Sequence, residues 1–189
     1  MAINDDYHEV MHMIDACLKH IFTHIYKTHR RELDVVQESF PHEDLVWLND
    51  TPVLRFAEAV KMLTDAGWTD EDGDPLKEDE DLGTRDEIRL GQLVKEKYKT
   101  DYYIIDKFPA SARPFYTMPD KHNRKWTNSF DFFLRGQEIL TGGQRIHQLK
   151  KLERAMISNG VQPEDMSDYC EAFQYVSLPL RSSLLLLRC

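Results

Sequence analysis

The sequence lacks the features of membrane and secreted proteins. No window approaches the roughly 18 consecutive apolar residues that a membrane-spanning helix needs. Met1 is followed by polar and acidic residues, whereas a secretory signal opens with basic residues and an apolar run. The three cysteines are an odd number without a C-x-x-C pair, which argues against a disulfide framework and against a zinc ribbon. We therefore expect a soluble protein of a reducing, cytoplasmic compartment.

What the sequence does contain suits one globular domain. Its 189 residues are 41% hydrophobic and 30% charged, and neither an internal repeat nor a flexible linker is visible. The net charge of -9 would ordinarily disfavour a nucleic-acid partner. However, residues 70–81 contain eight acids and one base, so this segment carries -7 and the remaining chain only -2. The overall acidity therefore does not exclude tRNA or nucleotide binding elsewhere.

Apolar residues at helical spacing predict helices. They are expected over residues 7–30, 55–66, 84–98, 149–158 and 164–173. The helix over 84–98 begins with a capping-box pattern, in which the Thr84 hydroxyl accepts a backbone hydrogen bond and Glu87 reaches back.

Runs of β-branched and aromatic residues predict strands. They are expected over residues 33–36, 44–48, 101–106 and 113–118. Residues 129–135 alternate, so that Phe130, Phe132 and Leu134 face one side of the strand. Gly136 breaks this alternation and residues 138–140 resume it, which predicts an antiparallel hairpin with its turn at Arg135 and Gly136.

The first predicted helix contains an H-E-x-x-H pattern, formed by His8, Glu9 and His12. In zinc peptidases this pattern supplies two metal ligands and a catalytic base. No third ligand stands in a recognisable position, and His20 and His24 repeat the same spacing on the same helix. A solvated helix face rich in histidine explains both pairs, so we favour it over a zinc site.

The acidic segment invites comparison with a calcium loop. Asp70, Asp72, Asp74 and Asp81 stand at positions 1, 3, 5 and 12 of such a loop. Pro75 stands where the loop needs a glycine, so we favour a solvated surface insertion.

The predicted hairpin carries residue types that bind metals and anions. The pleat sends Asp131 and Glu138 to the same face, close enough to share a divalent cation. Residues 141–145 then supply a hydroxyl, two glycines that permit close backbone approach, an amide and a guanidinium, a set suited to a small carboxylate. An ordinary surface hairpin is the competing interpretation.

Several longer segments resemble a known family. They are Tyr7–Met11, Leu90–Tyr98, Asp106–Pro109, Arg113–Pro119, Asn128–Gly136 and Glu138–His147. These segments closely resemble the catalytic domain of eukaryotic cytoplasmic aspartyl-tRNA synthetases, especially fungal ones, and the resemblance runs from Met1 to about Tyr175. It implies an α+β fold, a partial class II synthetase core in which helices flank an antiparallel sheet. We expect this domain to span residues 1–175, with the acidic insertion at 69–83 and a divergent tail at 176–189.

The resemblance also implies an activity and the residues that serve it. The family activates aspartate with ATP and Mg²⁺ and transfers it to tRNA. Asp131 and Glu138 would bind Mg²⁺ and the phosphates of ATP. Thr141 stands where the family usually has a serine near the amino acid, and Arg145 would hold the side-chain carboxylate of aspartate. Gln148 departs from the family, which usually has an aspartate at that position.

Other family regions are not found in the sequence. The signature that builds the dimer and the signature whose arginine grips the α-phosphate are expected upstream of Met1, and the glycine-rich third signature does not follow Tyr175. Activation needs preorganised positive groups around the phosphate, so we expect weak or no activity from this chain. Without the strands of those regions, the sheet would have unpaired edges and an exposed core face. The leucine run at 184–187 would either cover this surface or add to the exposed apolar area.

Two interpretations of function follow. In the first, the chain is a partial aspartate-tRNA ligase, and a second synthetase subunit is a possible partner. In the second, it is a truncated, non-catalytic paralogue that acts as an interaction module for a full-length synthetase. The sequence leaves open whether the amino-acid ligand is aspartate or asparagine.

Overall fold

A five-stranded sheet forms the centre of the computed structural model, which describes residue 3, residues 5–175 and residues 183–187. Its strands, in their order across the sheet, are β1 (Val53–Arg55), β2 (Tyr102–Asp106), β3 (Ser129–Leu134), β4 (Gln137–Gln144) and β5 (Ser183–Leu187). β1 is parallel to β2, and each later pair is antiparallel. The helices are α1 (His8–Thr28), α2 (Arg30–Ser39), α3 (Phe56–Asp65), α4 (Thr84–Tyr98), α5 (Leu149–Ser158) and α6 (Ser167–Tyr175).

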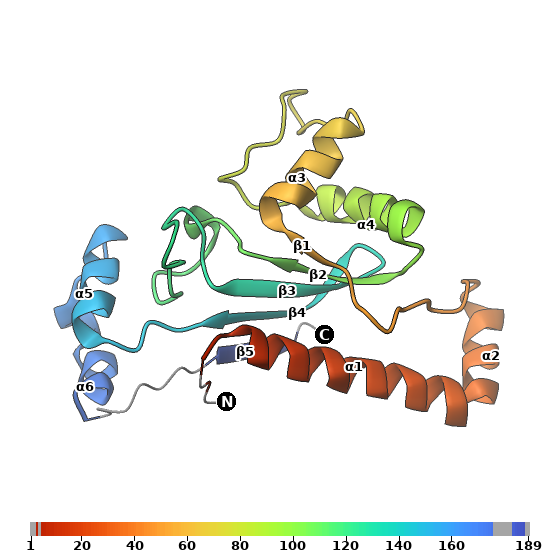
Figure 1. Cartoon of the computed structure of the whole chain (residues 1–189), viewed down its shortest axis with the longest axis horizontal. Coiled ribbons are helices and arrows are strands. Elements are labelled where there is room, and N and C mark those ends of the chain that lie inside the picture. The colour runs from red at the N-terminus through yellow and green to blue at the C-terminus, as the bar shows by residue number, and fades with distance from the viewer. Residues whose placement is uncertain (1–2, 4, 176–182, 188–189) are drawn as a thin grey trace.

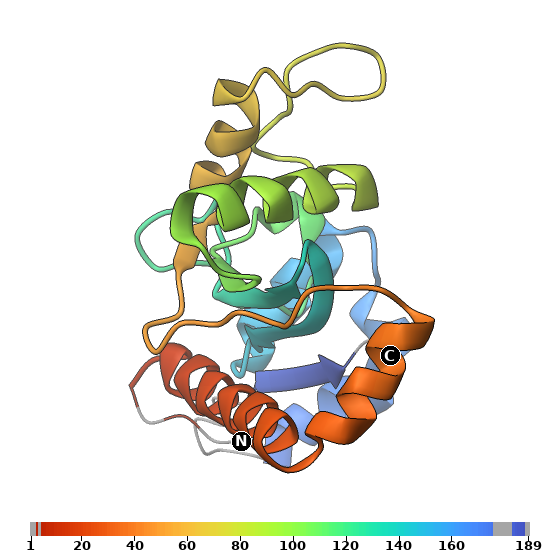
Figure 2. The ribbon, with the colours of Figure 1, turned by 90° about the vertical axis from the view of Figure 1, so that its right-hand side faces the viewer.

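Helices cover both faces of the sheet (Figures 1 and 2). Alternation along β2 sends Tyr103 and Ile105 into the core beneath α3 and α4, and sends Tyr102 and Ile104 into the core against α1. All five residues of β2 are buried, as expected for a strand covered on both faces. The prediction of an α+β fold with an antiparallel sheet between helices is confirmed, and the short parallel strand β1 is an addition to it.

A third apolar cluster lies at one end of the sheet, where α5 and α6 pack (Figure 1). Its buried members are Ile146, Leu152, Met156 and Cys170. Residues 115–118 pack against this cluster, so the loop between β2 and β3 is held against α5. α2 lies at the opposite end of the molecule (Figure 1).

The turn between β3 and β4 lies at Arg135 and Gly136, as predicted. Both residues have positive φ, 53° and 76°, which matches the right-handed twist of a two-residue hairpin. α4 packs directly on this turn, because a Cβ added to Gly91 would lie 2.5 Å from the Cα of Gly136. Only glycine at position 91 permits this approach without a shift of backbone.

Two predicted strands near the N-terminus are wrong. Residues 33–36 belong to α2, where an ion pair between Arg30 and Asp34, four residues apart, supports a helix despite the adjacent valines. Residues 44–48 contain no strand. The Val46 amide donates to the Asp101 carboxylate at 2.9 Å and the Asp101 amide donates back to the Val46 carbonyl, so these contacts do not extend into a ladder.

The strand predicted at 113–118 is also wrong. This segment makes one isolated bridge, between Thr117 and Arg145, because Pro114 and a preceding short 3₁₀ helix bend the chain. The capping box of α4 is shifted by one residue. The Asp86 carboxylate, instead of Glu87, reaches back to the amide of Gly83, at 3.1 Å.

The backbone of β5 pairs with β4 in antiparallel register, with Thr141 opposite Leu186. The leucine run therefore supplies an edge strand to β4, which was one of the two outcomes expected for it. The remainder of the predicted tail, residues 176–182 and 188–189, lies outside the described residues.

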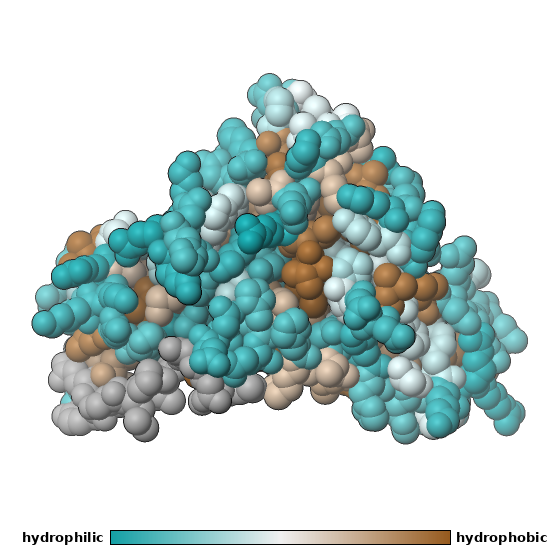
Figure 3. All heavy atoms as spheres, in the orientation of Figure 1, coloured by the Kyte–Doolittle hydropathy of each residue, from teal (hydrophilic) through white to brown (hydrophobic). Residues whose placement is uncertain are grey.

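Hydrophilic side chains cover most of the face shown in Figure 3. Among the large apolar side chains that are exposed, Phe40 and Val35 lie at and near the end of α2. No helix among the described residues is long and apolar enough to cross a membrane.

Candidate functional site

The hairpin of β3 and β4 presents the predicted carboxylates on one face. Asp131 pairs with Thr141 across the two strands, and Phe133 pairs with Glu138. Because Asp131 and Phe133 are two residues apart on β3, their side chains share a face, and their cross-strand partners share it too. The predicted placement of Asp131 and Glu138 on one face is therefore found in the fold.

A β-bulge brings Thr141 to the same face. Phe132 pairs with Leu140 and Phe133 with Glu138, so Ile139 is an extra residue in β4. In a regular strand, residues 138 and 141 would point to opposite faces. The bulge thus gathers two carboxylates and a hydroxyl on one side of the sheet.

Arg113 joins this group and was not predicted as a site residue. Its Nη2 lies 2.5 Å from Oδ2 of Asp131, and its Nη1 donates to the Thr141 hydroxyl at 3.2 Å. The guanidinium also stacks on Phe108, with its carbon 3.7 Å from the ring centroid. Arg113 therefore ties the loop after β2 to the hairpin face.

Burial dominates the electrostatics of Asp131, whose side chain is 4% exposed. Burial raises the pKa of its carboxyl to about 6, while the Arg113 charge lowers it and the nearby Glu138 charge raises it further. One carboxylate oxygen, Oδ1, is buried and has no hydrogen-bond partner among the described residues. Such an atom is costly to bury unless a ligand or an ion completes its environment.

Arg145 lies just beyond the end of β4, half-buried between two aromatic side chains. Its guanidinium carbon is 4.7 Å from the centroid of the Tyr116 ring, and its Nη1 donates to the Tyr169 hydroxyl at 3.2 Å. Alternation places Arg145 on the same face as Thr141, four residues earlier. The site thus holds a half-buried guanidinium in contact with two tyrosine side chains.

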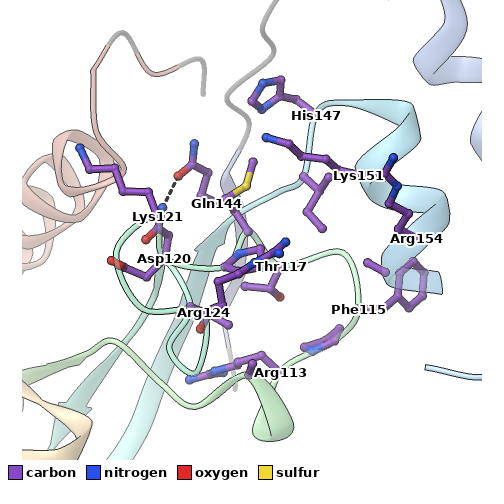
Figure 4. A pocket seen from close by; sticks show the side chains of 18 of the residues that line it. Arg113, Phe115, Thr117, Asp120, Lys121, Arg124, Gln144, His147, Lys151 and Arg154 are labelled. Carbon is purple, nitrogen blue, oxygen red and sulfur yellow. Dashed lines mark hydrogen bonds between the residues drawn. The ribbon is translucent and has the colours of Figure 1, made fainter. Parts of the chain in front are cut away.

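A large hollow adjoins this group, with a volume of about 1070 Å³ (Figure 4). The loop between β2 and β3, the end of β4 and one face of α5 line it. Arg113 is part of this lining, whereas Asp131, Glu138, Thr141 and Arg145 are not. Arg113 therefore connects the hollow to the face that carries the predicted residues.

The H-E-x-x-H pattern has a structural role in the fold. The Glu9 carboxylate accepts hydrogen bonds from the amides of Asp5 and Asp6, at 2.7 and 3.2 Å, and so caps the start of α1. His8 Nε2 lies 3.0 Å from the carboxylate of Asp106. Within the described part of the chain, no cluster of three or more His, Cys, Asp or Glu side chains suits a metal ion.

The side chains of the acidic segment form hydrogen bonds and an ion pair within the segment and do not form a calcium-binding loop. The Asp70 carboxylate accepts hydrogen bonds from the amides of Asp72 and Asp74, at 3.0 and 2.8 Å. Lys77 pairs with Glu80 at 2.6 Å. These contacts are those of a turn at the surface.

Sequence reasoning missed Arg113 because its partner is distant. Asp131 lies 18 residues later, and no periodicity links the two positions. The sequence feature that could have indicated Arg113 is the family-like segment Arg113–Pro119, in which an arginine precedes a run of apolar and aromatic residues. A charged group beside such a run needs a partner once the run is buried.

Known proteins are similar to this chain in fold and in sequence. The structure of the aspartyl tRNA synthetase from Entamoeba histolytica matches with a TM-score of 0.87 and 41% identity, over 95% of this chain and 36% of that one. The "Aspartate--tRNA ligase, cytoplasmic" of Bos taurus is 44% identical over 95% of this chain and 34% of its own length. The asparaginyl-tRNA synthetase of E. histolytica matches with a TM-score of 0.77 at 19% identity, over 93% of this chain and 38% of that one, and this likeness shows the fold alone.

The fold and the hairpin face together define a class II aminoacyl-tRNA synthetase core. The family model "tRNA synthetases class II (D, K and N)" matches residues 1–181. The chain belongs to this family. It spans about a third of the length of the relatives that it matches.

Proposed function

We propose that this chain carries the part of an aspartate-tRNA ligase that binds magnesium-bound ATP and aspartate. The observation that carries the proposal is the shared face of Asp131, Glu138 and Thr141, with Arg145 on the same side of β4. The identity to relatives named aspartate-tRNA ligases supports it. The full reaction, including transfer to tRNA, belongs to this proposal.

The donor set fits a magnesium ion. Mg²⁺ prefers oxygen ligands, and in nucleotide sites one or two carboxylates commonly hold it together with the phosphates. Asp131 contributes a buried carboxylate oxygen without a partner in the described structure, and Glu138 lies close enough to influence its charge. When bound, Mg²⁺ would neutralise phosphate charge in the activation of the amino acid.

Arg113 holds the side chains of Asp131 and Thr141 in place when no ligand is bound. Its guanidinium compensates the buried charge of Asp131 and fixes the Thr141 hydroxyl. A cation that arrives at Asp131 competes with this guanidinium for the carboxylate. Arg113 therefore acts as a positioning residue in the proposed site.

Arg145 supplies the selectivity for the amino acid. A guanidinium binds a carboxylate through two parallel hydrogen bonds, whereas the side-chain amide of asparagine offers a single acceptor oxygen. Two proteins of one organism support aspartate over asparagine. Identity is 41% with the aspartyl enzyme of E. histolytica and 19% with its asparaginyl enzyme.

The same proposal covers the surroundings of the site. We assign the synthetase domain to residues 1–175, with a surface insertion at 69–83 and a divergent tail at 176–189. The first relatives are named cytoplasmic, and we extend that compartment to this chain. A second synthetase subunit is the proposed protein partner.

Thermal unfolding with combined ligands tests the proposal. The melting temperature of the wild-type chain should rise with aspartate, ATP and MgCl₂ together, and should rise less when asparagine replaces aspartate. Arg145→Gln should lose the part of the rise that depends on aspartate, and Glu138→Gln the part that depends on magnesium-bound ATP. A matched exposed variant, Lys27→Gln, should respond like the wild type. A wild-type chain without any response would contradict the proposal and favour the non-catalytic interaction module.

A further inference from the structure

Two histidines on the exposed side of α1 take no part in the proposed site. His20 and His24 are four residues apart in the C-terminal half of the helix, and both are exposed. Side chains at this spacing lie one above the other on the same face of an α-helix. Their rings are stacked, with centroids 6.3 Å apart and planes inclined by 19°. The helix therefore presents two imidazoles side by side to solvent.

The separation of the two rings is close to that of a metal chelate. Zinc binds imidazole nitrogen at about 2.0–2.1 Å, which places the centroids of two imidazoles on one tetrahedral ion about 5 Å apart. The rings of His20 and His24 thus need to approach each other by about 1 Å to share an ion. Exposed side chains make such a change by rotation about χ1 and χ2, without a shift of the backbone.

The other histidine pair on α1 has the same spacing but different surroundings. The rings of His8 and His12 have centroids 6.4 Å apart. Nε2 of His8 lies 3.0 Å from the Asp106 carboxylate, and its Nδ1 contacts the carboxylate of Asp6. An ion that binds His8 has to displace one of these carboxylates. The H-E-x-x-H pair is therefore the natural control for the pair at 20 and 24.

The charges around His20 and His24 permit a cation to bind. Two basic side chains of this region are already paired, Lys19 with Asp15 at 2.6 Å and Arg30 with Asp34 at 2.8 Å. In addition, α1 ends at Thr28, one turn beyond His24. The C-terminal end of a helix carries a partial negative charge, which favours a cation nearby.

We infer that His20 and His24 together bind a divalent transition-metal ion such as Zn²⁺ or Ni²⁺. Imidazole nitrogen suits these ions, whereas Mg²⁺ and Mn²⁺ prefer oxygen ligands. Because no cluster of three or more His, Cys, Asp or Glu side chains suits a metal in the described ranges, the two imidazoles are the protein ligands and water completes the coordination. The inference does not rest on the proposed function. A bound ion would join two successive turns of α1 at the end of the helix that lies beside α2 (Figure 1).

Isothermal titration of the full 189-residue chain with NiCl₂, and in parallel with ZnCl₂, tests the inference. The wild type should bind one ion per chain, and His20→Gln and His24→Gln should each weaken binding by at least about tenfold, because each leaves a single imidazole. His12→Gln and Cys17→Ser change exposed side chains of the same helix and should alter the affinity by less than about twofold. An excess of MgCl₂ should not compete, since Mg²⁺ prefers oxygen ligands.

Urea unfolding gives a second readout. An ion that binds only the folded helix should raise the unfolding midpoint of the wild type and of His12→Gln, and should leave that of His24→Gln unchanged. Circular dichroism without metal checks that each variant is folded. Weakening by His12→Gln or Cys17→Ser equal to that by His24→Gln, or titrations that do not saturate, would overturn the inference. These outcomes are separable from failure of the proposed function, because the titrations contain neither ATP nor aspartate.

Discussion

Arg113 and Asp131 form a buried ion pair that ties the loop after β2 to strand β3. Nη2 of the arginine lies 2.5 Å from Oδ2 of the aspartate, and the two side chains are 13% and 4% exposed. The pair thus stands between the hairpin face, where the predicted ligands gather, and the hollow beside α5. Breaking it should affect stability and ligand binding together.

Removing either partner of this pair should destabilise the fold by about 3 kcal/mol, because the other charge then stays buried without compensation. We expect this for Arg113→Met and for Asp131→Asn, and the double variant should cost less than the sum of the two. Urea unfolding of the four proteins gives the coupling free energy. The exposed pair Lys61 and Asp65 is the control, and its coupling should stay below about 1 kcal/mol. Equal coupling free energies in the two pairs would show that burial does not strengthen the interaction between Arg113 and Asp131.

Stability should also depend on pH through Asp131. Burial raises the pKa of its carboxyl to about 6, from about 3.9 in an unfolded chain. Between these values the native state binds more protons than the unfolded state, so the contribution of this group to stability falls as pH rises. The free energy of unfolding of the wild type, minus that of Asp131→Asn, should drop by on the order of 3 kcal/mol from about pH 4 to about pH 7. A difference that stays constant over this range would contradict the raised pKa.

His8 should act in the same sense as Asp131. Its pKa is raised, first by the hydrogen bond to Asp106 at 3.0 Å and also by the charges of Asp106 and Asp6, although burial opposes the shift. Protonated His8 therefore stabilises the native state at a pH below about 6.5, and this stabilisation is lost as pH rises through the raised value. The cost of His8→Gln, measured by urea unfolding, should be largest at low pH and smaller above it. In an Asp106→Asn background the pH dependence of that cost should weaken, and an unchanged profile there would argue against this contact as the main cause.

Gly91→Ala should destabilise the protein by about 1–3 kcal/mol, although alanine ordinarily favours a helix by about 1 kcal/mol over glycine. The new Cβ would lie 2.5 Å from the backbone of Gly136 in the hairpin turn, and neither backbone can give way easily. Thermal unfolding measures the effect. Gln92→Ala, exposed on the same helix, should stay within about 0.5 kcal/mol of the wild type. A neutral Gly91→Ala would mean that α4 and the turn are not in tight contact.

The hairpin could be predicted from the sequence because its information is local. Alternation over 129–135 and the break at Gly136 fix which side chains share a face, and Asp131 and Glu138 follow from that pattern. The bulge at Ile139 could not be foreseen, since an inserted residue interrupts alternation without a distinct signal of its own. Its consequence, Thr141 on the face of Glu138, therefore appears only in the fold.

Errors arose where distant contacts decide the local structure. Val35 and Val36 suggest a strand, yet in the fold Asp44, from beyond the helix, accepts hydrogen bonds from Arg30 and Gln37 of α2. Residues 113–118 have the composition of a strand, but the segment packs against the cluster of α5 and α6 and makes one isolated bridge, between Thr117 and Arg145. The role of Arg113 could not be predicted because it depends on its ion pair with Asp131 on β3.

The most direct test of the account uses Mn²⁺ in place of Mg²⁺, because this paramagnetic ion broadens the NMR signals of nearby nuclei. With ATP and Mn²⁺ present, the backbone amides of Asp131, Glu138 and Thr141 should broaden first, and those of α2 should stay sharp. Glu138→Gln should greatly reduce this selective broadening. Uniform broadening, or selective broadening elsewhere in the molecule, would contradict a metal and nucleotide site on the β3–β4 hairpin.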